Sequence, residues 1–319
     1  MLSEAFRDID ELLAFCQLQR EDVSLLPNSP FALRVTRYYA SLIEKGNPTD
    51  PLLLQVLPRN MEQQEVDGYS FDAVGDQQAM ALPGLIHKYH GRALLTLTGA
   101  CAIHCRYCFR RHFPYQQAHC DLDMDSRVFD YLRQHQEIHE VILSGGDPLM
   151  LSDQKLSQLI RHLNSIGHIR LLRIHSRLLS VLPERINQQL VTCLQEFDGQ
   201  VVLVTHINHA QELSEENQQV FRHLKQQGFH LFNQSVLLKQ VNDDVDTLAA
   251  LSYQLFDSGI TPYYLHCLDK IQGAAHFDLS EHESCEIYHE LRARLPGYLL
   301  PSMVREIAGE TSKTPVNCS

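Results

Sequence analysis

The sequence predicts an α/β fold built as a partial barrel of six strand–helix units, with a helical extension at its N-terminus. From residue 93 onward, short apolar runs alternate with amphipathic stretches of helical period. Such alternation is typical of parallel strands joined by helical crossovers. Polar residues able to do chemistry follow the strand runs, as expected at the carboxyl ends of barrel strands. A doubly wound sheet is the alternative arrangement.

Composition limits the class of protein. The chain has 319 residues, 44% of them hydrophobic, which is enough for one large domain or two small ones, and the alternation favours one. A net charge of −12 argues against a nucleic-acid partner. Nine cysteines, three of them clustered, indicate a metal site in a reducing compartment. No apolar run suits a signal peptide or a membrane span, so we expect a cytoplasmic protein without a membrane partner.

The first part of the chain, residues 1–85, reads as a helical region that precedes the barrel domain of residues 86–319. Helical apolar spacing covers residues 8–18, and a second helix is expected over residues 31–45. A polar, glycine-containing stretch over residues 63–76 is predicted to be a loop.

The barrel domain contains six β-branched-rich runs, each followed by a helical stretch. The predicted strands are residues 93–98, 141–144, 171–175, 201–205, 230–235 and 261–267. The predicted helices are residues 126–136, 153–165, 183–197, 214–227, 243–258 and 280–294. Residues 299–304 are expected to form a last strand.

Three cysteines follow the first strand with the spacing C-x3-C-x2-C: Cys101, Cys105 and Cys108. Thiolates suit iron–sulfur clusters and zinc. Zinc fingers and ferredoxins need a fourth ligand nearby, whereas three ligands on a four-iron cluster leave one iron open. Three merely buried cysteines are the alternative interpretation.

The other strands also end in polar residues. The second ends at Gly145-Gly146-Asp147, an ordinary turn signal that also lets a ligand approach the backbone. The remaining strand ends carry His175-Ser176-Arg177, His206-Ile207-Asn208-His209, Asn233-Gln234-Ser235 and His266-Cys267-Leu268-Asp269. Any one of them could be structural, but together on one face they predict a single large site.

The cysteine loop and the Gly-Gly-Asp turn together resemble the radical S-adenosylmethionine (SAM) superfamily, and the expected fold is that family's partial barrel. The resemblance implies a 4Fe–4S cluster on the three cysteines, with SAM bound to its open iron. It also implies that Gly145, Gly146 and Asp147 receive the methionine end of SAM. His206 and Asn208 are expected to line the same pocket, and Gln234 is expected to contact one of the cofactors.

Longer segments resemble the lysine 2,3-aminomutases over about residues 30–315, and residues 109–115 and 268–277 are similar to their short bacterial branch. That branch makes β-lysine for the modification of translation elongation factor P. The resemblance implies a second cofactor, pyridoxal phosphate, held by a lysine as a Schiff base. Lys313 is the expected lysine, although only Gly309 remains of the glycine-rich run that precedes it in the family.

The same resemblance implies the other ligand contacts. Arg92 is expected to bind the pyridoxal phosphate group, with Lys88 a weaker candidate, because guanidinium groups match phosphate geometry. Arg110 is expected to bind the substrate carboxylate, and Asp269 the distal ammonium of lysine. Glu306 stands where a second aspartate is usual, and it is the other expected ammonium contact.

The expected partners are free L-lysine, an electron donor and, indirectly, the ligase of the elongation factor P pathway, with a homo-oligomer possible. The other six cysteines show no pairing signature, and the zinc-binding cysteines that longer relatives carry beyond the cofactor lysine are not expected. Two alternatives stay open. The scaffold could act on another amino acid, such as glutamate, or the chain could be a non-catalytic iron–sulfur or zinc-binding protein.

Overall fold

The computed structural model describes residues 4–26, 28–118, 120, 122 and 126–318. Its central feature is one ten-stranded sheet in which every strand pairs with the next strand along the chain. Strands β3 to β9 are parallel, while β1, β2 and β10 join the two edges in antiparallel fashion. A doubly wound sheet reverses its strand order at a switch point. The unbroken order therefore confirms the predicted partial barrel.

All six predicted strands are present, and the last strand lies close to its expected place. The strands β1 and β2 were not predicted. β1 lies inside the predicted helical region of residues 1–85, and β2 begins at its last residue. The strand bounds are β1 Met80–Leu82, β2 Leu85–Tyr89, β3 Arg92–Thr96, β4 Glu140–Ser144, β5 Leu171–His175, β6 Gln200–Thr205, β7 His230–Val236, β8 Thr261–His266, β9 Ser302–Arg305 and β10 Thr314–Pro315.

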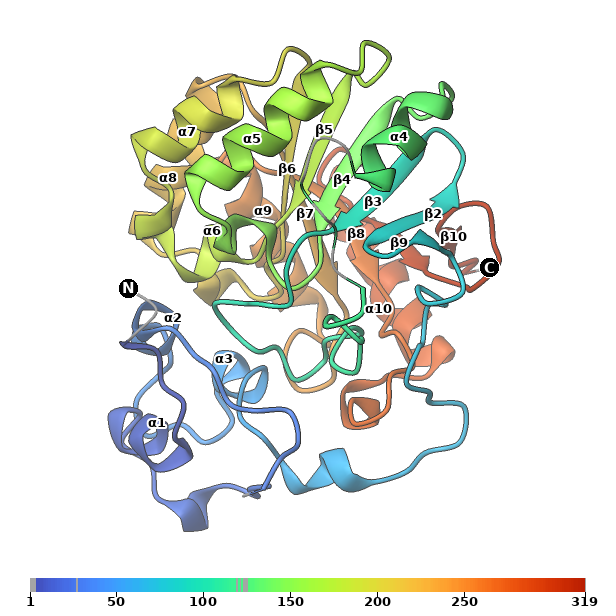
Figure 1. The fold of residues 1–319 in the computed structure, drawn as a ribbon. Coiled ribbons are helices and arrows are strands. Elements are labelled where there is room, and N and C mark those ends of the chain that lie inside the picture. The colour runs from blue at the N-terminus through green and yellow to red at the C-terminus, as the bar shows by residue number, and fades with distance from the viewer. Residues whose placement is uncertain (1–3, 27, 119, 121, 123–125, 319) are drawn as a thin grey trace.

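The six predicted crossover helices are also present, and Figure 1 shows them along the outside of the sheet. None of the helices in the described part of the chain has both the length and the apolar character needed to cross a bilayer. The α-helix bounds are α1 Ile9–Phe15, α2 Arg37–Ser41, α3 Pro51–Leu54, α4 Arg127–Gln134, α5 Asp153–Asn164, α6 Leu178–Val181, α7 Gln188–Gln195, α8 Glu215–Gln226, α9 Val245–Asp257 and α10 Glu281–Arg294.

Local sequence explains why the crossover helices form where they do. The Ser152 and Ser214 side chains accept hydrogen bonds from the first turns of α5 and α8, and Asp244 caps α9 in the same way. On α5 the buried residues Leu156, Leu159, Ile160 and Leu163 recur at helical spacing. The helices therefore present an apolar stripe to the sheet.

The second predicted helix of the N-terminal region also departs from prediction. The helix expected over residues 31–45 is only α2, and its first half is extended instead. Val35 forms a backbone bridge with Phe6, and Thr36 caps α2 through its hydroxyl. A contact between residues far apart in sequence thus overrides the local helical pattern.

The N-terminal region lies against the carboxyl ends of the strands. In Figure 1 it is the blue part below the sheet, and the teal loop with the cysteines lies between the two. Arg34 donates to the carbonyl of Cys101 at 2.9 Å, and the amide of Arg106 donates to the carbonyl of Gln55 at 2.8 Å. One continuous cluster of buried apolar side chains runs from Phe6 to Ile260. The barrel and the N-terminal region therefore share a core.

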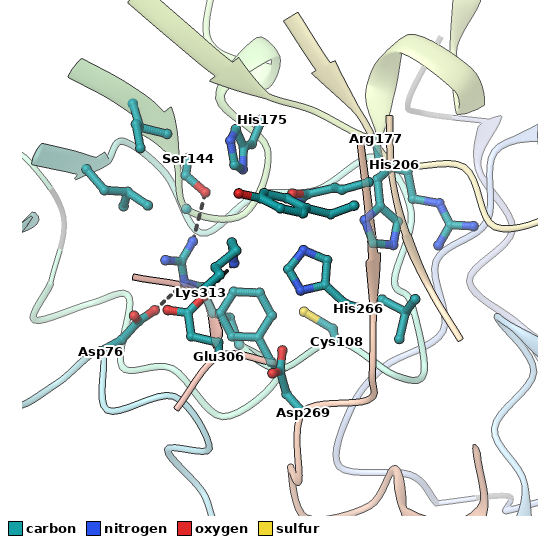
Figure 2. Close-up of a pocket in the computed structure, with 18 of the residues that line it drawn as sticks. Asp76, Cys108, Ser144, His175, Arg177, His206, His266, Asp269, Glu306 and Lys313 are labelled. Atoms are coloured by element: carbon teal, nitrogen blue, oxygen red, sulfur yellow. Dashed lines mark hydrogen bonds and ion pairs between the residues drawn. The ribbon is translucent and has the colours of Figure 1, made fainter. Parts of the chain in front are cut away.

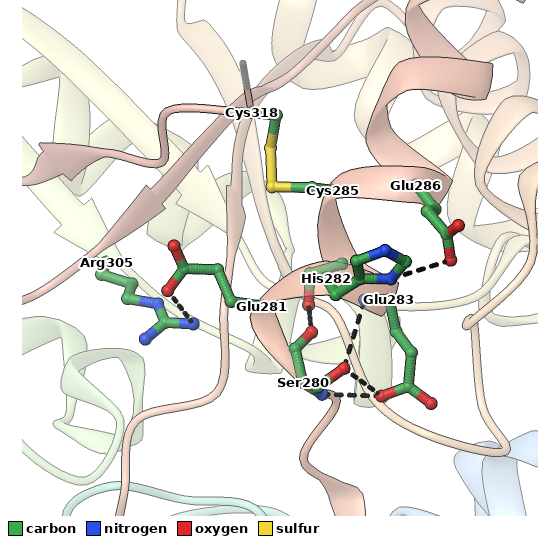
Figure 3. Close-up of a disulfide and its surroundings, with 9 residues drawn as sticks. Ser280, Glu281, His282, Glu283, Cys285, Glu286, Arg305 and Cys318 are labelled. Carbon is green, nitrogen blue, oxygen red and sulfur yellow. Dashed lines mark hydrogen bonds and ion pairs between the residues drawn. A yellow bond between two sulfur atoms is a disulfide. The ribbon is translucent and has the colours of Figure 1, made fainter.

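Two of the six remaining cysteines are paired, although the sequence shows no pairing signature for them. Cys285 in α10 and Cys318 form a disulfide, shown in Figure 3. Spacing could not reveal this pair because 33 residues separate its members. Cys16, Cys193 and Cys267 are buried and form no disulfide with any residue that the structure describes.

Candidate active site

One cavity of about 240 Å³ lies at the carboxyl ends of the strands. It brings together most of the residues that the sequence singled out, although they come from positions spread over more than 200 residues. The predicted residues that line it are Arg92, Cys105, Cys108, Arg110, Gly145, Gly146, His206, Gln234, Asp269, Glu306 and Lys313. Cys101, Asp147 and Asn208 are not among the lining residues.

The cysteine loop is held in place by its own arginines. Arg106 is fully buried and donates from Nε to the Glu62 carboxylate at 2.8 Å. Arg111 donates to the same carboxylate at 2.7 Å. Glu62 belongs to the N-terminal region, so a long-range ion pair fixes the loop between the two parts of the molecule. The Arg-rich character of this loop therefore has a structural use.

The three cysteines of the loop are free and only partly exposed. Burial and the neighbouring Cys105 raise the pKa of Cys108 to about 11, and burial and Cys108 raise the pKa of Cys101. The three thiol groups therefore interact electrostatically with one another in a poorly solvated loop. A cluster would displace their protons, because metals bind thiolates. The donor chemistry suits the expected three-ligand iron–sulfur cluster, although the described residues contain no group of three such donors already gathered as a metal site.

A buried arginine faces the middle cysteine. Arg177 Nη1 lies 2.7 Å from Cys105 Sγ, and Arg177 Nη2 donates to Glu212 at 3.1 Å and to Gln55 Oε1 at 2.8 Å. Tyr107 accepts a further bond from Arg177. The cation is positioned to stabilise thiolate charge beside the cluster site. The sequence marked Arg177 only as part of a polar strand end.

The Gly145-Gly146 turn packs directly on the cysteine loop. A Cβ at Gly145 would lie 2.6 Å from the carbonyl oxygen of Thr98, and one at Gly146 would lie 2.5 Å from that of Ala100. The Gly146 amide donates to Thr98. Glycine is therefore required here because two backbones touch, whatever ligand binds nearby.

Asp147, at the end of the same turn, has its carboxylate in use. It accepts from the Ser176 hydroxyl at 2.8 Å and from the amides of Leu178 and Leu149 at 2.9 and 3.1 Å. Burial raises its pKa to about 6, even though these donors oppose the shift. The Asp147 carboxylate therefore links the end of β4 to the end of β5 through hydrogen bonds. It is not among the residues that line the cavity.

His206 and Asn208 join a buried network beside the cluster site. His206 Nε2 lies 3.0 Å from the Tyr107 hydroxyl, and burial and Arg177 lower its pKa to about 3. Asn208 donates to the same hydroxyl at 2.7 Å and to Gln55 Oε1 at 3.0 Å. His206 lines the cavity. Asn208 does not, but it holds the cavity-lining Tyr107 through its hydrogen bond.

Two further histidines line the cavity with buried nitrogen atoms that lack a partner. Nε2 of His175 and Nε2 of His266 make no hydrogen bond to any residue that the structure describes. Burial lowers the pKa of both imidazoles well below the usual range, with Arg173 next in effect on His175 and Lys313 on His266. Unpaired buried polar atoms are costly, so a cavity lined in this way fits a polar ligand.

Lys313 lies inside the cavity, paired with a carboxylate. Its Nζ lies 2.7 Å from Glu306 Oε2. Figure 2 shows the Lys313 and Glu306 side chains next to each other. Glu306 Oε1 also pairs with Lys88 at 2.9 Å, and Lys88 pairs with Asp76 at 2.6 Å. Lys88, the weaker phosphate candidate, is thus committed to two carboxylates. Asp76 was missed because it ends a polar loop that shows no periodic pattern.

The two arginines of the cavity differ. Arg110 donates from Nε to Asp76 at 2.7 Å and from Nη1 to the Ser144 hydroxyl at 2.8 Å. Arg92 makes no ion pair with any described residue, and its guanidinium lies 4.8 Å from the centre of the Tyr89 ring. A cavity-lining guanidinium without an anion fits a phosphate group.

Asp269 is the carboxylate that remains without a cation. Its side chain forms neither an ion pair nor a hydrogen bond with any other residue in the described ranges, and Figure 2 shows it below Glu306 and Lys313. Burial and the nearby Glu306 raise its pKa to about 7. A carboxylate in this state gains most when a cation enters the cavity.

Comparison with known proteins identifies the class first. Residues 95–251 match the description "Radical SAM superfamily". The fold is similar to that of a radical SAM methyltransferase from Sphaerobacter thermophilus, with a TM-score of 0.50 and 15% sequence identity, covering 69% of this chain and 68% of that one. Residues 95–251 thus form a radical SAM domain, and the expected fold type is confirmed.

Two curated relatives narrow the class. The chain is 48% identical to "L-lysine 2,3-aminomutase" of Escherichia coli (strain K12), covering 99% of this chain and 93% of that protein. It is 46% identical to the protein of the same name from Haemophilus influenzae, covering 98% and 94%. The chain belongs to the L-lysine 2,3-aminomutase family, so the resemblance drawn from its motifs is confirmed.

Proposed function

We propose that the chain is a radical SAM enzyme that uses pyridoxal phosphate to convert L-lysine into β-lysine, moving the amino group from C2 to C3. The observation that carries the proposal is the cavity at the carboxyl ends of the strands. It is lined at once by two cluster cysteines, by Lys313, by a free guanidinium at Arg92 and by a free carboxylate at Asp269. Family membership supports the same activity.

Each cofactor has candidate residues in this chain. Cys101, Cys105 and Cys108 would hold the cluster, and Arg92 and Lys313 would hold the phosphate and the aldehyde carbon of pyridoxal phosphate. When bound, the cluster with SAM supplies a 5′-deoxyadenosyl radical, and pyridoxal phosphate supplies a carbonyl that captures the α-amine of the substrate. The unpaired nitrogens of His175 and His266 offer hydrogen bonds to these ligands.

The two ends of the substrate would meet opposite charges. Arg110 is held by Asp76 and Ser144 in a fixed orientation, which suits a planar carboxylate. Asp269 would receive the distal ammonium. Glu306 is already shared by Lys88 and Lys313, so we propose it as a weaker substrate contact than Asp269.

Charge also favours lysine over glutamate, the alternative substrate. A γ-carboxylate in the distal position would face Glu306 and Asp269, and burial together with repulsion from Glu306 already raises the pKa of Asp269. Like charges in a buried site cost free energy, while a distal ammonium relieves the repulsion.

The walls of the cavity would keep water away from a radical. The segment before β1 is fastened over the site: Ser70 bridges Ile271, and the carbonyl of Val74 accepts from Lys88 at 2.7 Å. On the other side Tyr107 and Arg177 close the space next to the cysteines. Excluding water strengthens the ion pairs inside and protects reactive intermediates.

The wider setting is also a proposal. We expect the enzyme to act in the cytoplasm on free L-lysine, with a separate electron donor reducing the cluster. A ligase would then pass the β-lysine to elongation factor P. Assembly into a homo-oligomer is compatible with this role.

The test is an anaerobic incubation of cofactor-loaded protein with dithionite, SAM and either L-lysine or L-glutamate. We expect β-lysine from lysine, no product from glutamate, and loss of product when SAM is omitted. Turnover of glutamate alone would favour the alternative aminomutase. Cofactor binding without any 5′-deoxyadenosine would favour a non-catalytic iron–sulfur protein.

A further inference from the structure

Asp76 enters the active site from outside the barrel. It belongs to the polar loop that precedes β1 within the N-terminal region, and the residue is 3% exposed. The turn before it brings Gly75, with φ +67°, against Ala308 of the C-terminal segment. Asp76 therefore lies where the polar loop meets the segment that carries Lys313.

Asp76 is one member of a continuous chain of ion pairs. Its Oδ2 accepts from Arg110 Nε at 2.7 Å, and its Oδ1 pairs with Lys88 Nζ at 2.6 Å. Lys88 pairs with Glu306 at 2.9 Å, and Glu306 pairs with Lys313 at 2.7 Å. Charges alternate along these five side chains, from the expected carboxylate site to the expected cofactor lysine.

We propose that Asp76 and Lys88 are positioning residues that poise the amine of Lys313 for the cofactor through this chain, an inference that rests on the proposed function. Lys88 stands between the two carboxylates and touches neither the cofactor lysine nor any uncommitted group. Its contacts decide how much of the Glu306 charge is available to Lys313. Asp76 in turn decides how strongly Lys88 is drawn away from Glu306.

The charge states of the chain agree with this geometry. Burial alone would raise the pKa of Glu306, but Lys313 and Lys88 outweigh it and hold the pKa well below its usual range. Burial likewise opposes ionisation of Asp76, but Arg110 and Lys88 keep its pKa low. Both carboxylates are therefore anionic at neutral pH, so removing either Asp76 or Lys88 changes the charge near Lys313 by one unit.

Removing Asp76 and removing Lys88 should affect Lys313 in opposite directions, because the two side chains carry opposite charges. Losing the anion at Asp76 lets Lys88 move onto Glu306, which weakens the hold of Glu306 on the Lys313 ammonium and favours the unprotonated amine. Losing the cation at Lys88 leaves Glu306 to Lys313 and Tyr89 and favours the ammonium. A residue that served only to hold the fold together would not produce shifts of opposite direction.

Other charged and titratable groups also face Lys313, and they are unchanged in both variants. They are His175 and Arg173 of β5, Tyr264 and His266 of β8, Asp269 beyond β8, Arg110 of the cysteine loop and Tyr89 of β2. Comparing the two variants therefore isolates the effect of the ion-pair chain on Lys313.

The experiment measures capture of pyridoxal phosphate by the cluster-containing protein, without SAM or reductant. The initial rate of Schiff-base formation is followed by absorbance as a function of pH, because only the unprotonated amine of Lys313 attacks the aldehyde. Asp76→Asn should lower the apparent pKa of this profile by about 0.5–1 pH unit, and Lys88→Met should raise it by about the same amount. Asp76→Glu should restore the wild-type profile to within about 0.3 unit.

Asp67→Asn, an exposed position of the same loop, is the matched control and should leave the profile unchanged. Shifts in the same direction for Asp76→Asn and Lys88→Met, or no shift in either, would overturn the proposal. If Asp76→Asn does not fold, Lys88→Met still decides by the sign of its shift. If wild-type protein captures no cofactor at Lys313, the proposed function fails; if it does and the profiles do not move, the ion-pair chain alone fails.

Discussion

The two sides of the cavity differ in how far their charged and polar groups already have partners within the protein. On the cysteine side, Arg177 and Tyr107 bond to each other and to neighbours from the N-terminal region, so both terminal nitrogens of Arg177 and the Tyr107 hydroxyl have partners within the protein, while Arg177 Nε has none among the described residues. On the opposite side, Arg92 and Asp269 face the cavity without a charged partner among the described residues. We propose that the first side holds the cluster and that the unpaired charges of the second side bind the substrate and pyridoxal phosphate.

The difference has a physical basis. A cluster needs a rigid, poorly solvated frame with a nearby cation, and buried hydrogen-bond networks such as that of Arg177 and Tyr107 provide rigidity. Substrate recognition needs groups whose desolvation is compensated on binding. The ion-pair chain from Arg110 to Lys313 lies between these extremes, because it is satisfied internally but ends at two groups that ligands are expected to engage.

The largest effect should come from breaking the cysteine side. We expect Cys105→Ser to reduce 5′-deoxyadenosine formation by at least about a thousandfold, because the cluster loses a ligand. Lys313 should still form its bond to pyridoxal phosphate, which absorbance can follow. Cys193→Ser, at a buried cysteine in α7, is the control and should retain turnover. Equal loss in both variants would remove the distinction between the two sides.

Stability should also differ between buried and exposed ion pairs. Arg177→Met leaves the fully buried Glu212 without its cation, and we expect a loss of about 3–5 kcal/mol in the free energy of unfolding. Arg161→Met breaks an exposed pair with Glu196 and should cost at most about 1 kcal/mol. Denaturant unfolding of the two proteins measures the difference. A small loss at Arg177 would show that the cysteine side is not held by this network.

On the opposite side, Asp269→Asn should act on binding. Removing a charge-assisted contact to the distal ammonium should raise the KM for lysine about 10- to 100-fold and change kcat much less. Steady-state kinetics separates the two constants. An unchanged KM would mean that the free carboxylate is not the ammonium site.

The weakest expected effect is on the pH dependence of lysine binding. Asp269 has a raised pKa of about 7, so it is mostly neutral below that pH and anionic above it. Lysine affinity should therefore rise by up to about tenfold between pH 6 and pH 8, as the carboxylate ionises. Asp269→Asn should flatten this profile. A wild-type KM that does not vary over this range would contradict the assigned ionisation.

Much of this site follows from periodicity and position. The strand runs and the polar residues at their ends predicted both the partial barrel and the cavity, because parallel strands bring their carboxyl ends to one face. Cys105, Arg92 and Lys313 meet there, although they are far apart in the sequence. The expectation held because strand–helix alternation leaves few ways to arrange the sheet.

What could not be predicted depends on long-range partners. Nothing in the local sequence reveals that Glu62 receives Arg106, that Asp76 receives Arg110, or that Cys285 pairs with Cys318. These contacts join segments whose relative placement only the folded chain determines. The Gly-Gly-Asp turn shows the same limit, because its glycines allow two backbones to touch and its carboxylate serves neighbouring amides.

The most direct test of the central claim is to locate the cofactor. Protein loaded with pyridoxal phosphate is reduced with borohydride, digested, and mapped by mass spectrometry, alongside Lys313→Ala and Lys88→Met. The account predicts an adduct on Lys313 in the wild-type protein and in Lys88→Met, and none in Lys313→Ala. An adduct on Lys88, or one that persists in Lys313→Ala, would contradict it.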